Sequence, residues 1–130
     1  MIDEITVNST AREELINIDR DIAGFIKRSE IKDGAITIFV PHTTAAVTIN
    51  ENADPSVARD IIKGLATVIP RNGGYSHIEG NSDAHIKASL IGHSERLIVS
   101  GGRPLLGTWQ SVYFCEFDGP RTRRMILQIQ

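Results

Sequence analysis

The chain has 130 residues, of which 41% are hydrophobic and 23% charged, as expected for one ordinary globular domain. Its formal net charge of -2 excludes the strongly basic face that nucleic-acid binding needs, and the arginines at 121, 123 and 124 are too few to change this. We therefore expect a single domain over residues 1–130, with no nucleic acid as partner.

The cysteine content and the N-terminus bear on the cellular compartment. Cys115 is the only cysteine, which excludes an intrachain disulfide and a cysteine-based zinc cluster. The first ten residues carry Asp3 and Glu4 and no apolar run, unlike a secretory signal, and the longest apolar stretches have only the length of strands. We expect a cytoplasmic protein with no membrane partner.

Four stretches in the first fifty residues have the period or the β-branched composition of strands. They are residues 4–10, 14–18, 35–40 and 45–50. Between the second and the third, Asp19 is placed to cap a helix in which Ile22, Phe25 and Ile26 recur at helical spacing.

The clearest helix lies in the middle of the chain. Asp54 can accept backbone N–H bonds as its N-cap, Pro55 suits the first helical position, and Pro70 ends it. Three later stretches again have the character of strands. They are residues 96–100, 108–117 and 125–130. In the second of these we expect Trp109 to be a core anchor rather than a stacking platform.

A shorter helix is predicted between these regions. Ser82 or Asp83 would cap it and Gly92 would stop it, and His85 and Ser89 would share one face. Strands then outnumber helices by about seven to three without regular alternation. The predicted fold class is α+β: one domain with a largely antiparallel or mixed sheet of about seven strands and about three packed helices.

Polar side chains gather in the segment HIEGNSDAH, residues 77–85. With His42, which follows a strand, His77 and His85 could form an open tetrahedral site that leaves a fourth position for water or substrate. No His-x-x-x-His pair supports this, so the alternative that each imidazole bonds to backbone or solvent stays open. For His93, beside a helix-ending glycine, we expect the latter.

The junction between the strand at 45–50 and the following helix carries a second polar group. Asn50, Glu51 and Asp54 stand where backbone N–H groups could bind an anion or carboxylates a hard cation. Capping explains Asp54, whereas neither strand nor cap requires Glu51. Thr43 is either a strand residue or part of this group.

Two basic residues are candidate phosphate ligands. Lys87 is either a solvated surface lysine or a ligand of a neighbouring site, and Arg103 stands in a glycine-rich turn that could cradle an anion. Gln110 and Glu116 fall on one face of the strand at 108–117. If that face is buried, each needs a hydrogen-bonding partner.

Three segments carry a resemblance to a known family. HTTAAVTINENADPSVARD, YSHIEGNSDAHIKAS and SERLIVSGGRPLLGTWQSVYFCEF resemble the YjbQ family, also called the secondary thiamine-phosphate synthase family. The resemblance covers nearly the whole chain. It implies a small α+β domain, a homotrimer, and in some members a weak activity that joins hydroxymethylpyrimidine diphosphate to thiazole phosphate.

The resemblance and the residue chemistry together give one leading hypothesis, a metal-assisted enzyme acting on a phosphorylated small molecule. The metal, zinc or magnesium, would be held by His42, His77 and His85. The catalytic residues would be Glu51, Glu79 and Lys87. The substrate would be bound by Thr43, Asn50, Asn81, Ser89, Arg103 and Gln110. The alternatives are a zinc-dependent hydrolase that uses the same residues and a non-catalytic trimer that binds a small anion.

Overall fold

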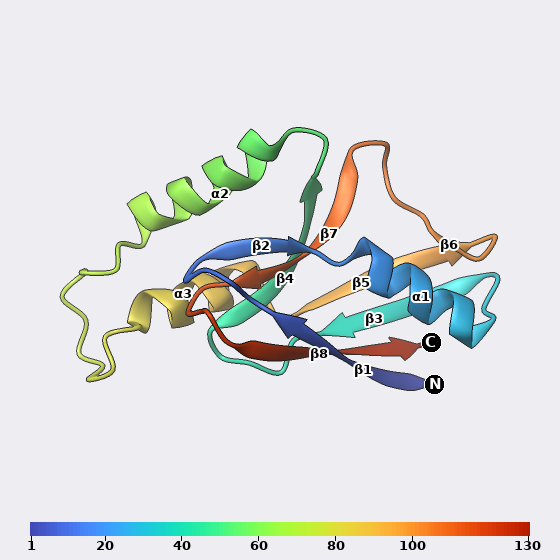
Figure 1. The fold of residues 1–130 in the computed structure, drawn as a ribbon, viewed down its shortest axis with the longest axis horizontal. Coiled ribbons are helices and arrows are strands. Elements are labelled where there is room, and N and C mark those ends of the chain that lie inside the picture. The colour runs from blue at the N-terminus through green and yellow to red at the C-terminus, as the bar shows by residue number, and fades with distance from the viewer.

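The computed structural model describes residues 1–130 as three helices and eight strands (Figure 1). The helices are α1 (Asp19–Ser29), α2 (Pro55–Val68) and α3 (Ser82–Ile91). The strands are β1 (Ile2–Asn8), β2 (Glu14–Asn17), β3 (Gly34–Phe39), β4 (Ala45–Glu51), β5 (Ser94–Ser100), β6 (Arg103–Pro104), β7 (Gln110–Glu116) and β8 (Thr122–Ile129).

The strands form two sheets in which every pairing is antiparallel. The first has five strands in the order β1-β8-β3-β5-β6, and the second has three in the order β2-β7-β4. The predicted α+β class is therefore confirmed. The additional strand, β6, is only two residues long and lies in the glycine-rich turn, where no periodicity could indicate it.

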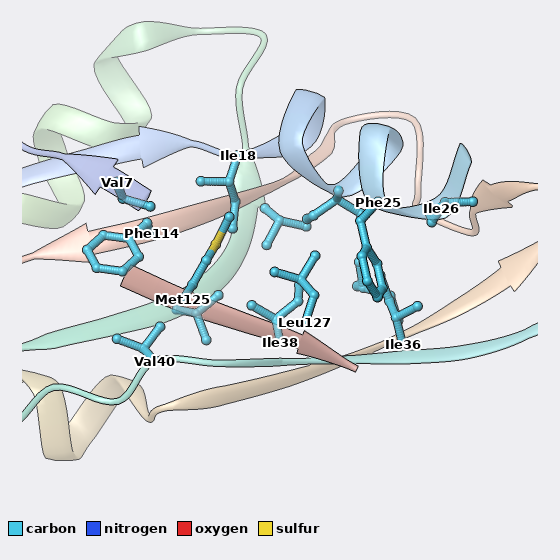
Figure 2. Packing of buried hydrophobic residues seen from close by; sticks show 14 of the residues in the cluster. Val7, Ile18, Phe25, Ile26, Ile36, Ile38, Val40, Phe114, Met125 and Leu127 are labelled. Carbon is cyan, nitrogen blue, oxygen red and sulfur yellow. The ribbon is translucent and has the colours of Figure 1, made fainter. Parts of the chain in front are cut away.

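The main core fills the space between the inner face of the five-stranded sheet and a layer formed by α1 and the three-stranded sheet (Figure 2). Phe25 of α1 and Phe114 of β7 are both fully buried there, against β-branched and other apolar residues of β3 and β8. The helical spacing of Ile22, Phe25 and Ile26 thus meets the core as predicted.

A second, smaller core lies between the three-stranded sheet and α3. Ala84 and Ala88 of α3 pack against Ala46, Cys115 and Phe117, and all five are buried. The small alanine side chains let the helix approach the sheet closely. This packing fixes the start of α3, and with it the neighbouring polar segment, on the sheet.

The helix ends follow the predicted signals with two shifts of position. Asp54 caps α2 by accepting the Ser56 N–H at 2.9 Å, as predicted. Asp19 does not cap α1 but is its first residue, and its carboxylate accepts the Val112 N–H at 2.9 Å from the neighbouring strand. The residue before α3 is Asn81, one position earlier than predicted.

Helix α2 stands away from the sheets over most of its length (Figure 1). None of its residues is buried, although its apolar residues form one stripe, and Leu65 alone packs at the edge of the smaller core. A stripe of this kind is normally buried against a partner surface. None of the three helices has both the length and the apolar character needed to cross a lipid bilayer.

Candidate functional site

Two of the predicted ligands, His77 and His85, lie together at the start of α3. Their ring centroids are 5.5 Å apart and the rings are nearly perpendicular, at 89°. Gly80 makes this approach possible, because its positive φ of 72° and the bond from its N–H to the His77 carbonyl, 3.2 Å, turn the loop back toward the helix. The Glu79 carboxylate lies 3.7 Å from His77 Nε2.

A hollow of about 290 Å³ opens beside His77. Its other lining residues are Arg71, Asn72, Gly74, Tyr75 and Gly80. Arg71 takes part in none of the ion pairs of the chain, so its guanidinium is available to a ligand. The segment 70–80 is exposed throughout. The sequence predicted a turn at residues 70–75 and candidate site residues at His77 and Glu79, but it did not single out Arg71 or Tyr75.

His42 has a different partner from the other two. Its Nε2 accepts the backbone N–H of Arg124 at 3.0 Å, so its proton is on Nδ1. Strand β3 pairs with β8 only as far as Ile126. Beyond that point the imidazole takes the place of a strand partner for the Arg124 N–H. Burial, with the nearby charge of Arg123, lowers the pKa of His42, which keeps the ring neutral and able to accept at neutral pH.

The donor set does not fit a metal ion held by one chain. No group of three His, Cys, Asp or Glu side chains is placed to hold a metal. Zinc sites need three or four protein ligands, and magnesium prefers oxygen ligands, whereas His77 and His85 supply two imidazoles. The zinc or magnesium ion stays a prediction, and no chemical step below passes through it.

Lys87 is fully buried in a network of charges, so its interpretation as a solvated surface lysine is wrong. Its ammonium donates to Glu13 at 2.7 Å and to Asp83 at 3.1 Å, and Arg12 donates to the other oxygen of Asp83 at 3.0 Å. Burial raises the pKa of Asp83, but hydrogen bonds from Arg12 and Lys87 outweigh it and hold the pKa below its usual value.

Because the ammonium already has two carboxylate partners, Lys87 ties α3 to the segment before β2 in this structure. The catalytic role predicted for it stays a prediction. Asn81 precedes the same helix and Ser89 lies within its last turn. Asn81 donates to Asp118 at 2.8 Å, and the Ser89 hydroxyl donates to the His85 carbonyl at 2.9 Å.

The residues predicted around Glu51 gather elsewhere, where β4 ends and β7 begins. Asn50 accepts the Glu51 N–H at 2.7 Å, Gln110 accepts the Gly107 N–H at 2.8 Å, and Glu51 pairs with Gln110 across the two strands. Figure 1 shows this place beside the start of α2, while the histidine pair follows the end of α2. One chain therefore does not bring the two groups together.

Three further residues were predicted near a site or in the core. Trp109 is 65% exposed, so its assignment as a core anchor is wrong; it precedes β7 rather than lying within the strand. Thr43 is exposed in the bend between β3 and β4. Arg103 lines a separate hollow beside the end of α1, on the far side of the molecule from α3 (Figure 1).

Comparison with known proteins places this fold and these residues in one family. The model of the family described as UPF0047 protein YjbQ-like matches residues 3–130. The chain belongs to the YjbQ-like UPF0047 family. The UPF0047 protein MJ1081 of Methanocaldococcus jannaschii is 53% identical over 129 residues, which are 99% of this chain and 94% of that protein. The UPF0047 protein YugU of Bacillus subtilis is 45% identical over 130 residues, with 99% and 98% covered.

Solved structures of YjbQ-like proteins share the whole fold. The chain matches a crystal structure of an uncharacterised YjbQ/UPF0047 protein from Clostridium acetobutylicum with a TM-score of 0.96 and 47% identity, covering 98% of this chain and 99% of that one. A YjbQ-like protein of unknown function from Sulfolobus solfataricus matches with a TM-score of 0.94 and 31% identity, covering 99% and 95%. The resemblance seen in the sequence is thereby confirmed.

Proposed function

We propose that this YjbQ-like protein is a small enzyme that acts on a phosphorylated small molecule at the hollow beside His77. The observation that carries the proposal is the pair of imidazoles, 5.5 Å apart, of which His77 lines a hollow that also presents an arginine without an ionic partner. Histidine is the side chain that most readily exchanges protons near neutral pH, and arginine matches the geometry of phosphate oxygens.

Arg71, the two imidazoles and Glu79 have different roles in the proposed reaction. Arg71 binds the phosphate group and neutralises charge that develops on a departing phosphate or diphosphate. The thiazole nitrogen attacks the pyrimidine methylene with its lone pair and has no proton to lose, so the imidazole pair acts on the leaving group: it donates a proton to the diphosphate as the C–O bond breaks and the C–N bond forms, with Glu79 orienting His77 across 3.7 Å. Arg71 thus takes the place that sequence reasoning gave to Lys87 and Arg103.

The reaction that we propose is the one implied by the family resemblance, the joining of hydroxymethylpyrimidine diphosphate to thiazole phosphate with release of pyrophosphate. The departing pyrophosphate is the group that needs a cation. The hollow, about 290 Å³, lies at the lower limit for small-molecule sites. It holds the diphosphate, and the remainder of the substrates extends over the exposed loop.

The proposal is tested with purified protein and three single variants. His85→Ala and Arg71→Gln should each lower kcat/KM by at least about tenfold, and His93→Ala, which follows the end of α3 and does not line the hollow, is the matched control and should not. Release of inorganic phosphate instead of coupling would select the hydrolase. Full activity of both site variants would refute the site, and binding of pyrophosphate without turnover would leave a non-catalytic anion-binding protein.

We also propose that the chain assembles as a homotrimer through α2, in agreement with the family resemblance. Support comes from the apolar stripe of this helix, in which Ile61 and Ile62 are only half-buried and no residue is buried. Light scattering should give a trimer for the wild type and for Lys63→Asp, and a smaller species for Ile61→Asp.

A further inference from the structure

A second hollow, of about 700 Å³, lies between the end of α1 and the turn that joins β5 to β6. Its lining residues are Ile26, Lys27, Glu30, Ile31, Lys32, Gly101, Gly102 and Arg103. This volume falls well within the range of small-molecule sites. The elements that line it, the end of α1 and β6, lie at the opposite end of the molecule from the start of α3 (Figure 1), so the function proposed above does not explain this hollow.

The hollow combines an apolar floor with a basic rim. Ile26 is buried and Ile31 half-buried, and both belong to the main core, so the floor is rigid. Lys27, Lys32 and Arg103 are exposed around it, and none of them takes part in any ion pair of the chain.

Local structure accounts for only one of these three cations. Lys27 lies in the last turn of α1, where a positive charge complements the negative end of the helix dipole. Lys32 and Arg103 lie outside helices and have no such role. The only carboxylate that lines the hollow is Glu30, and the nearby Asp33 is already occupied in accepting the Gly101 N–H at 3.2 Å.

The glycines shape the hollow rather than bind through their N–H groups. Gly101 and Gly102 both have positive φ, 59° and 75°, a conformation that side chains rarely adopt. The N–H of Gly102 donates to the Lys32 carbonyl at 2.9 Å, and that of Gly101 donates to Asp33. The double turn thus ties the β5–β6 connection to the segment after α1 and sets Lys32 and Arg103 on the same rim.

We propose that this hollow is a second binding site, specific for a small molecule in which a phosphate or carboxylate group is attached to an apolar or aromatic body. The body lies on the isoleucine floor, and Lys32 and Arg103 bind the anionic group. Because the cations are exposed, the affinity falls as the ionic strength rises. The site is independent of the proposed enzymatic function, and its test uses binding alone.

The test is a titration with phenyl phosphate, and separately with inorganic phosphate, followed by amide chemical shifts. Phenyl phosphate should shift the Gly101 and Gly102 signals in a saturable way and bind at least about fivefold more tightly than phosphate, because only it covers the apolar floor. Adding salt to about 0.5 M should weaken both.

Charge-matched variants separate a built site from general attraction. Lys32→Gln with Arg103→Gln should weaken phenyl phosphate binding by about tenfold, because two exposed cations each contribute a few-fold. Arg59→Gln with Lys63→Gln removes the same charge from the exposed face of α2 and should change binding less than twofold. Equal loss in the two double variants, shifts that do not saturate, or no preference for phenyl phosphate over phosphate would overturn the proposal.

Discussion

The buried ion pair between Glu116 and Arg123 gives the sharpest test of the forces that hold this fold. The Arg123 side chain is 3% exposed and that of Glu116 is fully buried. Arg123 Nε donates to both carboxylate oxygens, at 2.9 and 3.1 Å, and Ser9 donates to the same carboxylate at 2.6 Å. The pair connects β7 of one sheet to β8 of the other, so it lies where the two sheets meet.

Arg123→Met removes the cation and leaves the Glu116 carboxylate buried without a counter-charge. Breaking a buried pair in this way costs about 3–5 kcal/mol of unfolding free energy. For a chain of this size that corresponds to a fall in Tm of roughly 10–20 °C. Arg124→Met in the next position removes a half-exposed pair with Glu4 and should cost less than about 1 kcal/mol.

Chemical denaturation followed by far-ultraviolet circular dichroism measures both variants, with the slope of the transition checked for constancy. The double variant Glu116→Gln, Arg123→Met should lose about 2 kcal/mol less than the sum of the single variants, because removal of both charges leaves no uncompensated ion. An Arg123→Met protein within about 1 kcal/mol of the wild type would refute the claim that this carboxylate depends on its partner.

The same pair predicts how stability changes in acid. Burial raises the pKa of Glu116, but hydrogen bonds from Arg123 and Ser9 outweigh it, so the folded pKa lies below the ordinary value of 4.5. The unfolded chain therefore binds the proton first as pH falls. This stabilisation is complete above the unfolded pKa and disappears as pH falls through the folded one. The double variant should lose this part of the acid sensitivity.

Single substitutions at four other positions test the burial and backbone geometry seen in the structure. Burial lowers the pKa of His42 in the folded protein, so the unfolded imidazole binds a proton more readily and the wild type should lose stability between pH 7.5 and 5. Denaturation midpoints measured across this range should show a smaller loss for His42→Gln and an unchanged loss for His93→Gln. Gly119→Ala would drive a Cβ into the backbone oxygen of Ala11 and should destabilise the fold by several kcal/mol. Gly64→Ala, in open space within α2, should instead stabilise it by about 0.5–1 kcal/mol in the same assay. Trp109→Ala should leave the melting temperature within a few degrees, because that side chain is 65% exposed.

Elements whose signals are contained in a few consecutive residues could be predicted from the sequence. The Asp54-Pro55 pair placed the start of α2, Gly92 placed the end of α3, and the β-branched run at 35–40 placed β3 within one residue. These signals depend on backbone sterics and on local hydrogen bonds. Neither requires knowledge of what the element packs against.

Burial of individual side chains could not be read in the same way. Lys87 has the neighbours of a surface lysine, and its burial depends on Glu13, which lies 74 positions earlier in the chain. Trp109 was expected inside because its segment was interpreted as a strand from residue 108. The strand begins at Gln110, so the indole falls in the preceding turn. In both cases tertiary pairing decides the outcome, and composition cannot.

In the candidate site, too, local signals could be predicted from the sequence and tertiary contacts could not. His77 and His85 are separated by a single glycine-containing turn and the start of a helix, so a local argument was sufficient to bring them together. His42 and Arg103 were assigned to the same site from their chemistry and from the family resemblance, without a local structural signal. The pairing of β3 with β8 gives His42 a backbone partner, and the β5–β6 turn carries Arg103 to the end of α1. Residue types therefore indicate which chemistry is possible, and sheet topology decides which of those residues meet.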